Sequence, residues 1–287
     1  MERLQVAIAK ARAARDGAAA DPDAVAAEAP RTRPPRRAPD VAAPPAAEGA
    51  GAEAWDAIPR FTPDAKLLER GRIVTATGGR QSTEFDKLRT RIAQQMQANG
   101  WTRMAITSPG PGCGKSTIAL NLSYSLTRQD AARIVLCEMD LRRPSLGRLT
   151  GAPTDRDFTE VLRGRASFAS QSVRLGDNFA AGFVRGAKGG TAELLQARST
   201  AEALDRLQAE YQPTTMVFDT PPLLVSDDTI GLVAHVDCAM IVAGAGTTTI
   251  AEIDTCEREL AAQVPVLGVV LNKCKHTGPQ TSDYYYY

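Results

Sequence analysis

The run Ser108-Pro109-Gly110-Pro111-Gly112-Cys113-Gly114-Lys115-Ser116-Thr117 decides the fold that we expect for this chain. It follows a strand-like apolar stretch, residues 102–107, and precedes a helical pattern over residues 116–128. In that context a glycine-rich loop lets backbone N–H groups surround phosphate oxygens, and the positive end of the helix dipole adds to the attraction. The run therefore predicts a nucleotide-binding phosphate loop.

Each polar residue of this loop has an expected task. Lys115 is expected to reach the terminal phosphates, and the Ser116 hydroxyl is expected to ligate magnesium. The strict motif has glycine where this chain has Pro109, and the glycines that follow are expected to compensate. The loop residues predicted to bind the nucleotide are Gly110, Gly112, Cys113, Gly114, Lys115, Ser116 and Thr117.

Short apolar runs alternate with helical patterns along the rest of the chain. Expected strands cover residues 133–138, 214–219, 238–243 and 264–272, and expected helices cover residues 191–210 and 249–263. This alternation predicts an α/β domain with a mostly parallel, twisted sheet and helices on both faces. Ligands of such sheets lie at the carboxyl ends of the strands.

Two of these strands are expected to end in acidic residues. An apolar run leads into Glu138-Met139-Asp140, and two carboxylates separated by one residue at a strand end point to the same side. Another apolar run ends at Asp219, as in strands that deliver one carboxylate to a metal. Ser116, Asp140 and Asp219 are predicted to hold a magnesium ion, because hard cations take oxygen ligands.

Composition excludes several other classes of protein. The chain has 287 residues and a net charge of +1, so no basic surplus points to a nucleic-acid partner. Two histidines and five cysteines without CxxC spacing argue against zinc, and the scattered cysteines suit a reducing cytosol. We expect neither a signal peptide nor a membrane-spanning segment.

Four regions are predicted along the chain. Residues 1–18 are expected to form a short helix, either frayed or folded against a partner. Residues 19–71, rich in Ala, Pro and Arg, are predicted to be a disordered linker, whose arginines serve solubility or dock an anionic partner. Residues 72–275 are predicted to form the nucleotide-binding domain, and residues 276–287 a flexible tyrosine-rich tail.

The loop, the segment Leu136 to Pro144, the segment Val217-Phe218-Asp219-Thr220-Pro221-Pro222 and the final four tyrosines together resemble the bacterial tyrosine kinases, the autokinases of capsule and exopolysaccharide synthesis. The resemblance extends over about residues 75–287. It implies a P-loop NTPase fold of the MinD/ParA-like type. It also implies a protein-tyrosine autokinase that uses ATP and Mg²⁺.

The resemblance implies roles for further residues. The tail tyrosines that would accept phosphate are Tyr284, Tyr285, Tyr286 and Tyr287. The family's proton acceptor corresponds to Glu138, where relatives usually have Asp, and this departure puts the rate in question. With Lys115 and Asp140 it forms the implied catalytic set. Asn272 corresponds to a family asparagine near the adenine.

The same resemblance implies partners and a location. The chain resembles the free-standing form of these kinases, which is cytoplasmic and is recruited to the inner face of the membrane by a separate transmembrane adaptor, a polysaccharide co-polymerase. Self-association is expected, although only Arg89 matches the residues that build rings in relatives, and a phosphotyrosine phosphatase is a further expected partner. Two alternatives stay open: an ATPase switch of the MinD/ParA type, whose second loop lysine is replaced by Gly110, and an ATP-binding regulator without kinase activity.

Overall fold

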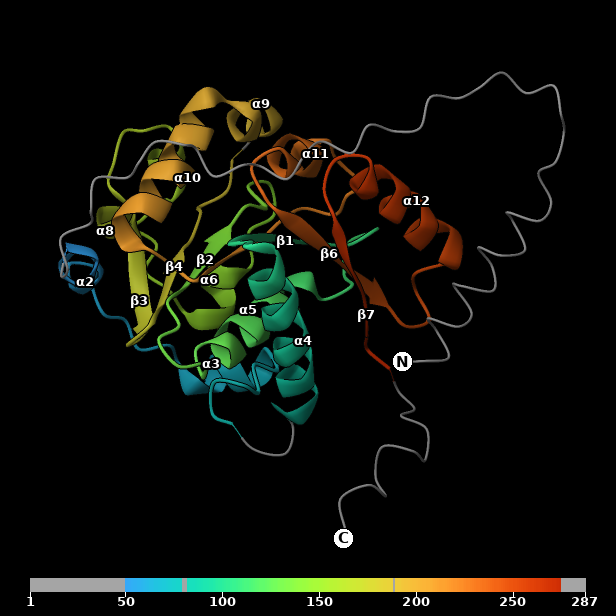
Figure 1. Cartoon of the computed structure of the whole chain (residues 1–287), viewed down its shortest axis with the longest axis horizontal. Helices are drawn as coiled ribbons and strands as arrows, with labels where there is room; N and C mark the ends of the chain where they lie inside the picture. Colours follow the sequence, from blue (N-terminus) through green and yellow to red (C-terminus); the bar gives the residue numbers. More distant parts are fainter. Residues whose placement is uncertain (1–49, 79–81, 188, 275–287) are drawn as a thin grey trace, which may run out of the picture. The chain divides into compact units, whose positions relative to one another are not determined.

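A seven-stranded sheet lies at the centre of the part of the chain that the computed structural model describes, residues 50–78, 82–187 and 189–274 (Figure 1). The strand order is β3-β4-β2-β5-β1-β6-β7, and every neighbouring pair is parallel except β3 and β4. The strands are β1 (Arg103–Thr107), β2 (Ile134–Glu138), β3 (Ser172–Gly176), β4 (Phe179–Gly182), β5 (Thr215–Asp219), β6 (Cys238–Gly244) and β7 (Val266–Asn272). The predicted mostly parallel α/β architecture is confirmed.

Helices cover both faces of this sheet. They are α2 (Ala50–Asp56), α3 (Ala65–Arg70), α4 (Thr83–Asn99), α5 (Lys115–Leu126), α6 (Leu146–Thr150), α7 (Thr159–Leu162), α8 (Phe168–Gln171), α9 (Thr191–Gln196), α10 (Arg198–Tyr211), α11 (Asp228–Val233) and α12 (Ile250–Ala261). No helix within the described ranges is both long and apolar enough to cross a membrane.

Alternation along the strands divides the core into two layers. In β2, Val135 and Cys137 belong to the same core cluster as residues of α2, α7, α8, α9, α10, α11 and α12, whereas Ile134 and Leu136 belong to the cluster that contains residues of α3, α4, α5 and α6. All four side chains are fully buried, because a parallel sheet with helices on both faces exposes neither face of its central strands. Figure 1 shows these two groups of helices on opposite sides of the sheet.

Two features of the strands and helices differ from the expectations or were not predicted. The single helix expected over residues 191–210 is two helices, α9 and α10, because Ala197 between them is extended (φ −62°, ψ 146°). The antiparallel pair β3 and β4 was not predicted. Strand β4 reads Phe-Ala-Ala-Gly, and Ala and Gly have low strand propensity, so the segment carries no recognisable strand pattern.

The predicted disordered linker, residues 19–71, is wrong for its last part. Residues 50–71 contain α2 and α3, and Trp55, Ile58 and Leu68 from this stretch are buried in the core. The Trp55 indole Nε1 donates a 2.7 Å hydrogen bond to the Asp177 carbonyl, and Asp64 caps α3. The Ala- and Pro-rich composition concealed a few large apolar anchors, whose burial stabilises the ordered backbone.

The remaining predictions for the chain termini lie outside the described residues. These are the helix over residues 1–18, the linker up to residue 49, and the tail with Tyr284, Tyr285, Tyr286 and Tyr287.

Replacing Trp55 by alanine tests whether α2 belongs to the folded domain. Trp55→Ala removes a buried ring and its hydrogen bond, so the free energy of unfolding should fall by about 3 kcal/mol. The measurement is urea unfolding followed by circular dichroism. Glu53→Ala, an exposed position on the same helix, is the matched control and should change stability by less than about 0.5 kcal/mol. Equal stability of the two variants would contradict an anchored α2.

Candidate functional site

The phosphate loop joins the carboxyl end of β1 to the first turn of α5. Gly112 and Gly114 have left-handed φ angles of +77° and +89°, which residues with a Cβ atom rarely adopt. Pro109 stands where the strict motif has glycine, and its backbone φ is not positive. Proline suits this position, because the pyrrolidine ring fixes φ near about −65°.

Two side-chain hydrogen bonds hold this loop in place. Ser108 Oγ donates to the Gly110 carbonyl at 2.7 Å, and Asn272 Nδ2, at the end of β7, donates to the Cys113 carbonyl at 2.9 Å. A Cβ on Gly114 would clash with the Asn272 amide, so this position requires glycine for space as well as for φ. Asn272 thus contacts the loop backbone, a role that the sequence did not indicate. Its predicted contact with adenine stays a prediction.

Lys115, the first residue of α5, is paired with Asp140. Lys115 Nζ lies 3.1 Å from Asp140 Oδ2, and the two side chains are only 13% and 6% exposed. The other oxygen of Asp140 accepts a hydrogen bond from the Arg143 N–H. The structure therefore brings together two residues of the predicted catalytic set from different elements, at the carboxyl end of the sheet.

Asp219, the last residue of β5, carries the least compensated charge of the site. Its carboxylate is fully buried, and neither oxygen has a hydrogen-bond partner among the described residues. Burial raises the pKa of Asp219 to about 6, against the opposing effects of Lys115 and of the Ser116 hydroxyl, which lies near it without hydrogen-bond geometry. A buried carboxylate without donors is costly unless a cation compensates it.

This arrangement fits a magnesium ion. Mg²⁺ is usually bound through one or two carboxylates, with water and substrate phosphates as its other ligands. Asp219 offers two oxygens without hydrogen-bond partners, Asp140 is close enough for its charge to raise the pKa of Asp219, and the Ser116 hydroxyl belongs to the first turn of α5. The residues present therefore suit the predicted metal.

Glu138 has a different environment from the other two acids. Cys137 and Met139 pack in the core layer beneath α10, so Glu138 and Asp140 face the other side of the sheet, as strand alternation predicts. The Glu138 carboxylate is fully buried and accepts three backbone hydrogen bonds, from Ser145, Leu146 and Val184. Burial nevertheless raises the pKa of Glu138 to about 7.

These bonds define what Glu138 does in the described structure. The carboxylate ties the end of β2 to the start of α6 and to the segment after β4. Oε1 accepts two of the three donors and Oε2 accepts only the Val184 N–H, so a lone pair of Oε2 is left that could take a proton. Its predicted role as proton acceptor stays a prediction.

An arginine next to the site was not assigned a role from the sequence. Arg142 Nε lies 2.6 Å from Asp228 Oδ2, and Asp228 also accepts hydrogen bonds from Thr191 and Ser226. Asp228 is fully buried, whereas the Arg142 side chain is 51% exposed. The two residues are 86 positions apart, so no local pattern could have paired them.

Comparisons with known proteins agree with the fold. No family model matches the chain. It is similar to the kinase domain of the Escherichia coli tyrosine kinase ETK, with a TM-score of 0.60 and 22% identity, over 69% of this chain and 79% of that structure. At this level of identity the match establishes the shared P-loop fold.

Sequence comparison adds relatives of two lengths. The chain is 30% identical over 189 residues to a putative tyrosine-protein kinase, EpsB, of Ralstonia nicotianae, a match over 64% of this chain and 24% of the relative. It is 28% identical over 212 residues to the tyrosine-protein kinase YwqD of Bacillus subtilis, over 72% of this chain and 86% of the relative. The chain thus spans about a quarter of the length of the first relatives that it matches. The homologues of this chain are bacterial tyrosine-protein kinases, and the family resemblance drawn from its motifs is confirmed.

Proposed function

We propose that this chain is an ATP-dependent protein-tyrosine kinase that phosphorylates its own C-terminal tyrosines, Tyr284, Tyr285, Tyr286 and Tyr287, between subunits. The observation that carries the proposal is the buried, unpartnered carboxylate of Asp219 beside Lys115 and the phosphate loop. This is a site prepared for a cation and a polyphosphate, in a chain that ends in four tyrosines.

The site residues divide the work of phosphoryl transfer. The backbone of the phosphate loop and Lys115 bind and orient the phosphates of ATP, which is most of what this reaction needs from a protein. Asp140, Asp219 and Ser116 would hold the magnesium ion, which would supply charge neutralisation at the transferring group. For Lys115 this requires a change of partner from the Asp140 carboxylate to the nucleotide.

The acceptor chemistry needs a base, because a tyrosine hydroxyl has a pKa of about 10. Glu138 is the family-implied proton acceptor, and in this proposal its Oε2, which accepts only the Val184 N–H, takes the proton. In the described structure Glu138 positions the loop before α6 and the segment after β4. The two tasks predict different behaviour of the same variants.

The wider setting is also proposed from the family resemblance. The kinase is cytoplasmic, self-associates, and is recruited to the inner face of the membrane by a separate transmembrane adaptor. Phosphorylation of the tail regulates exopolysaccharide or capsule polymerisation and export, and a phosphotyrosine phosphatase resets it. Pull-down of the chain by the cytoplasmic segment of a membrane protein encoded beside it would test the adaptor.

Phosphotyrosine formation tests the activity itself. The full chain, incubated with ATP, Mg²⁺ and the adaptor segment, should become labelled on tyrosine. Lys115→Met should lower labelling at least about a hundredfold, because it removes a charge aimed at the transferring phosphates. Replacing all four tail tyrosines by phenylalanine should remove most of the label. ATP binding without any phosphotyrosine would instead support the alternative of a regulator that binds ATP and transfers nothing.

Asp219→Asn tests the metal assignment through stability as well as binding. Removing a buried charge without donors should raise the free energy of unfolding by about 1–3 kcal/mol in metal-free buffer. The same variant should lose Mg²⁺-dependent nucleotide affinity, measured by calorimetry. Asp237→Asn is the control, for which we expect the free energy of unfolding to fall instead of rise. The Asp237 carboxylate accepts hydrogen bonds from the Thr102 and Arg103 N–H groups, so its loss should destabilise the fold. A destabilised Asp219→Asn variant would contradict the assignment.

Two variants of Glu138 separate positioning from proton transfer. Glu138→Gln replaces an acceptor oxygen by a donor that faces backbone N–H groups, so positioning predicts a loss of about 1–3 kcal/mol of stability together with lower kinase activity. A proton-transfer role predicts a rate loss of about 10²–10⁴-fold with stability unchanged. Glu138→Asp should restore activity if the carboxylate acts as the base. The Glu138→Asp variant should stay less stable than the parent protein if the longer glutamate is needed for the hydrogen bonds from Ser145 and Leu146.

A further inference from the structure

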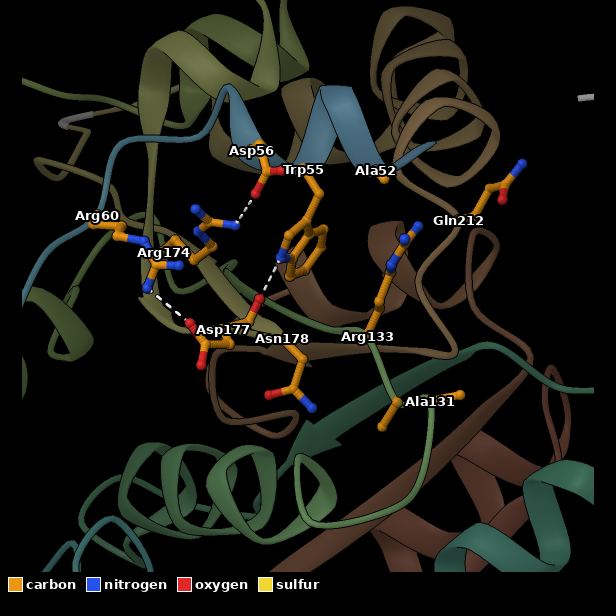
Figure 2. Close-up of a pocket in the computed structure, with 11 residues that line it drawn as sticks. Ala52, Trp55, Asp56, Arg60, Ala131, Arg133, Arg174, Asp177, Asn178 and Gln212 are labelled. Carbon is orange, nitrogen blue, oxygen red and sulfur yellow. Dashed lines mark hydrogen bonds and ion pairs between the residues drawn. The ribbon is translucent and has the colours of Figure 1, made fainter. Parts of the chain in front are cut away.

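A cavity lies at the opposite end of the sheet from the phosphate loop. Its volume is about 700 Å³, and it opens where β2 and β4 begin. Helix α2, the loop before β2, strand β3 and the end of α10 supply its walls (Figure 2). We call it the distal arginine cavity, after its lining residues Arg60, Arg133 and Arg174.

The charges of this cavity do not cancel. Arg174 Nη1 lies 2.7 Å from Asp56 Oδ1, and Arg60 Nη1 lies 2.8 Å from Asp177 Oδ1. Among the described residues no carboxylate pairs with Arg133, the third arginine. Figure 2 shows Arg133 on one side of Trp55 and the two paired arginines on the other. The cavity therefore keeps one positive charge without a counter-charge.

Arg174 adds unmet hydrogen-bonding capacity. Its side chain is only 7% exposed, and its Nε has no hydrogen-bond partner among the described residues. Its acid partner, Asp56, is 73% exposed, and Asp177 on the rim is 87% exposed. Carboxylates so open to water are screened and compensate an arginine weakly. This weak compensation makes the guanidinium groups of the cavity receptive to a stronger anion.

The shape and lining of the cavity limit the kind of molecule that can carry this anionic group. The volume is several times that of a phosphate group, and Ala52, Ala131 and Trp55 form an apolar part of the wall. The exposed Asp56 and Asp177 repel an extended polyanion such as a nucleic acid or an anionic membrane surface. The ligand that fits best carries one compact group with two negative charges. The rest of that ligand is uncharged and partly apolar, so that it can contact the apolar wall.

We propose that the distal arginine cavity binds a phosphorylated tyrosine side chain on a polypeptide segment, and that the chain's own tyrosine tail is that segment. The second part rests on the proposed kinase activity. Phosphate provides three acceptor oxygens for arginine N–H donors, and the ring beneath it meets the apolar wall. The site lies away from the phosphate loop, so it holds the product of phosphorylation without occupying the nucleotide site.

Binding of a synthetic peptide tests the proposal without relying on kinase activity. The peptide spans residues 278–287, carries phosphate on Tyr285 and is labelled for fluorescence anisotropy. The protein is the full chain with Lys115→Met, which disables the phosphate loop as a competing phosphate site and keeps the chain's own tail unmodified. The phosphorylated peptide should bind at least about tenfold more tightly than the unphosphorylated peptide and than a peptide with Tyr285→Glu.

Three further variants of the protein assign that binding to the cavity. Arg133→Gln should weaken binding about tenfold, and Asp177→Asn should tighten it severalfold, because it removes a rim carboxylate. Arg198→Gln, which removes an arginine that is 91% exposed on α10, is the matched control and should bind as the parent does. Circular dichroism confirms that each variant is folded.

The outcomes separate this proposal from the kinase assignment. Unchanged affinity in a folded Arg133→Gln variant, or equal affinity for both peptides, would overturn the cavity as a phosphotyrosine site. Inorganic phosphate that displaces the peptide at equal concentration would overturn the assignment to a polypeptide ligand. Peptide binding in a protein that forms no phosphotyrosine would support the cavity and refute only its link to the chain's own activity.

Discussion

The buried carboxylate of Asp219 is the constraint on which the site depends. Its position comes from the parallel register of the sheet, in which Asp219 pairs with Ile106 of β1 on one side and with Glu138 of β2 on the other. The same register places the phosphate loop and both acidic strand ends at one edge. An uncompensated charge there lowers the stability of the empty fold and favours a bound cation, a common conflict between stability and function at active sites.

Glu138 links three elements at the carboxyl end of the sheet. Its side chain reaches backbone donors at Ser145, Leu146 and Val184. The result is a cross-link between β2, α6 and the end of β4, one strand away from Asp219. Rigid placement of Asp140 and Asp219 follows from neighbours that are themselves fixed.

The two ends of the sheet carry different chemistry. At the carboxyl end, the phosphate loop, Lys115 and two buried acids form the proposed nucleotide site. At the amino end, the stretch containing α2 packs Trp55 against the turn between β3 and β4 and so completes the distal arginine cavity. An ordered segment in front of the domain thus contributes a wall that the P-loop core alone does not have.

The sequence by itself determined the phosphate loop, the two acidic strand ends and the parallel sheet, because each depends on a local pattern of glycines, apolar runs and punctuating polar residues. It did not reveal the anchoring of α2, where a single tryptophan is hidden in an Ala- and Pro-rich stretch. Nor did it reveal the pairing of Arg142 with Asp228 or the contacts of Asn272 and Glu138. Those were decided only by the tertiary structure, because they join residues distant in sequence or depend on where a side chain meets a backbone from another element.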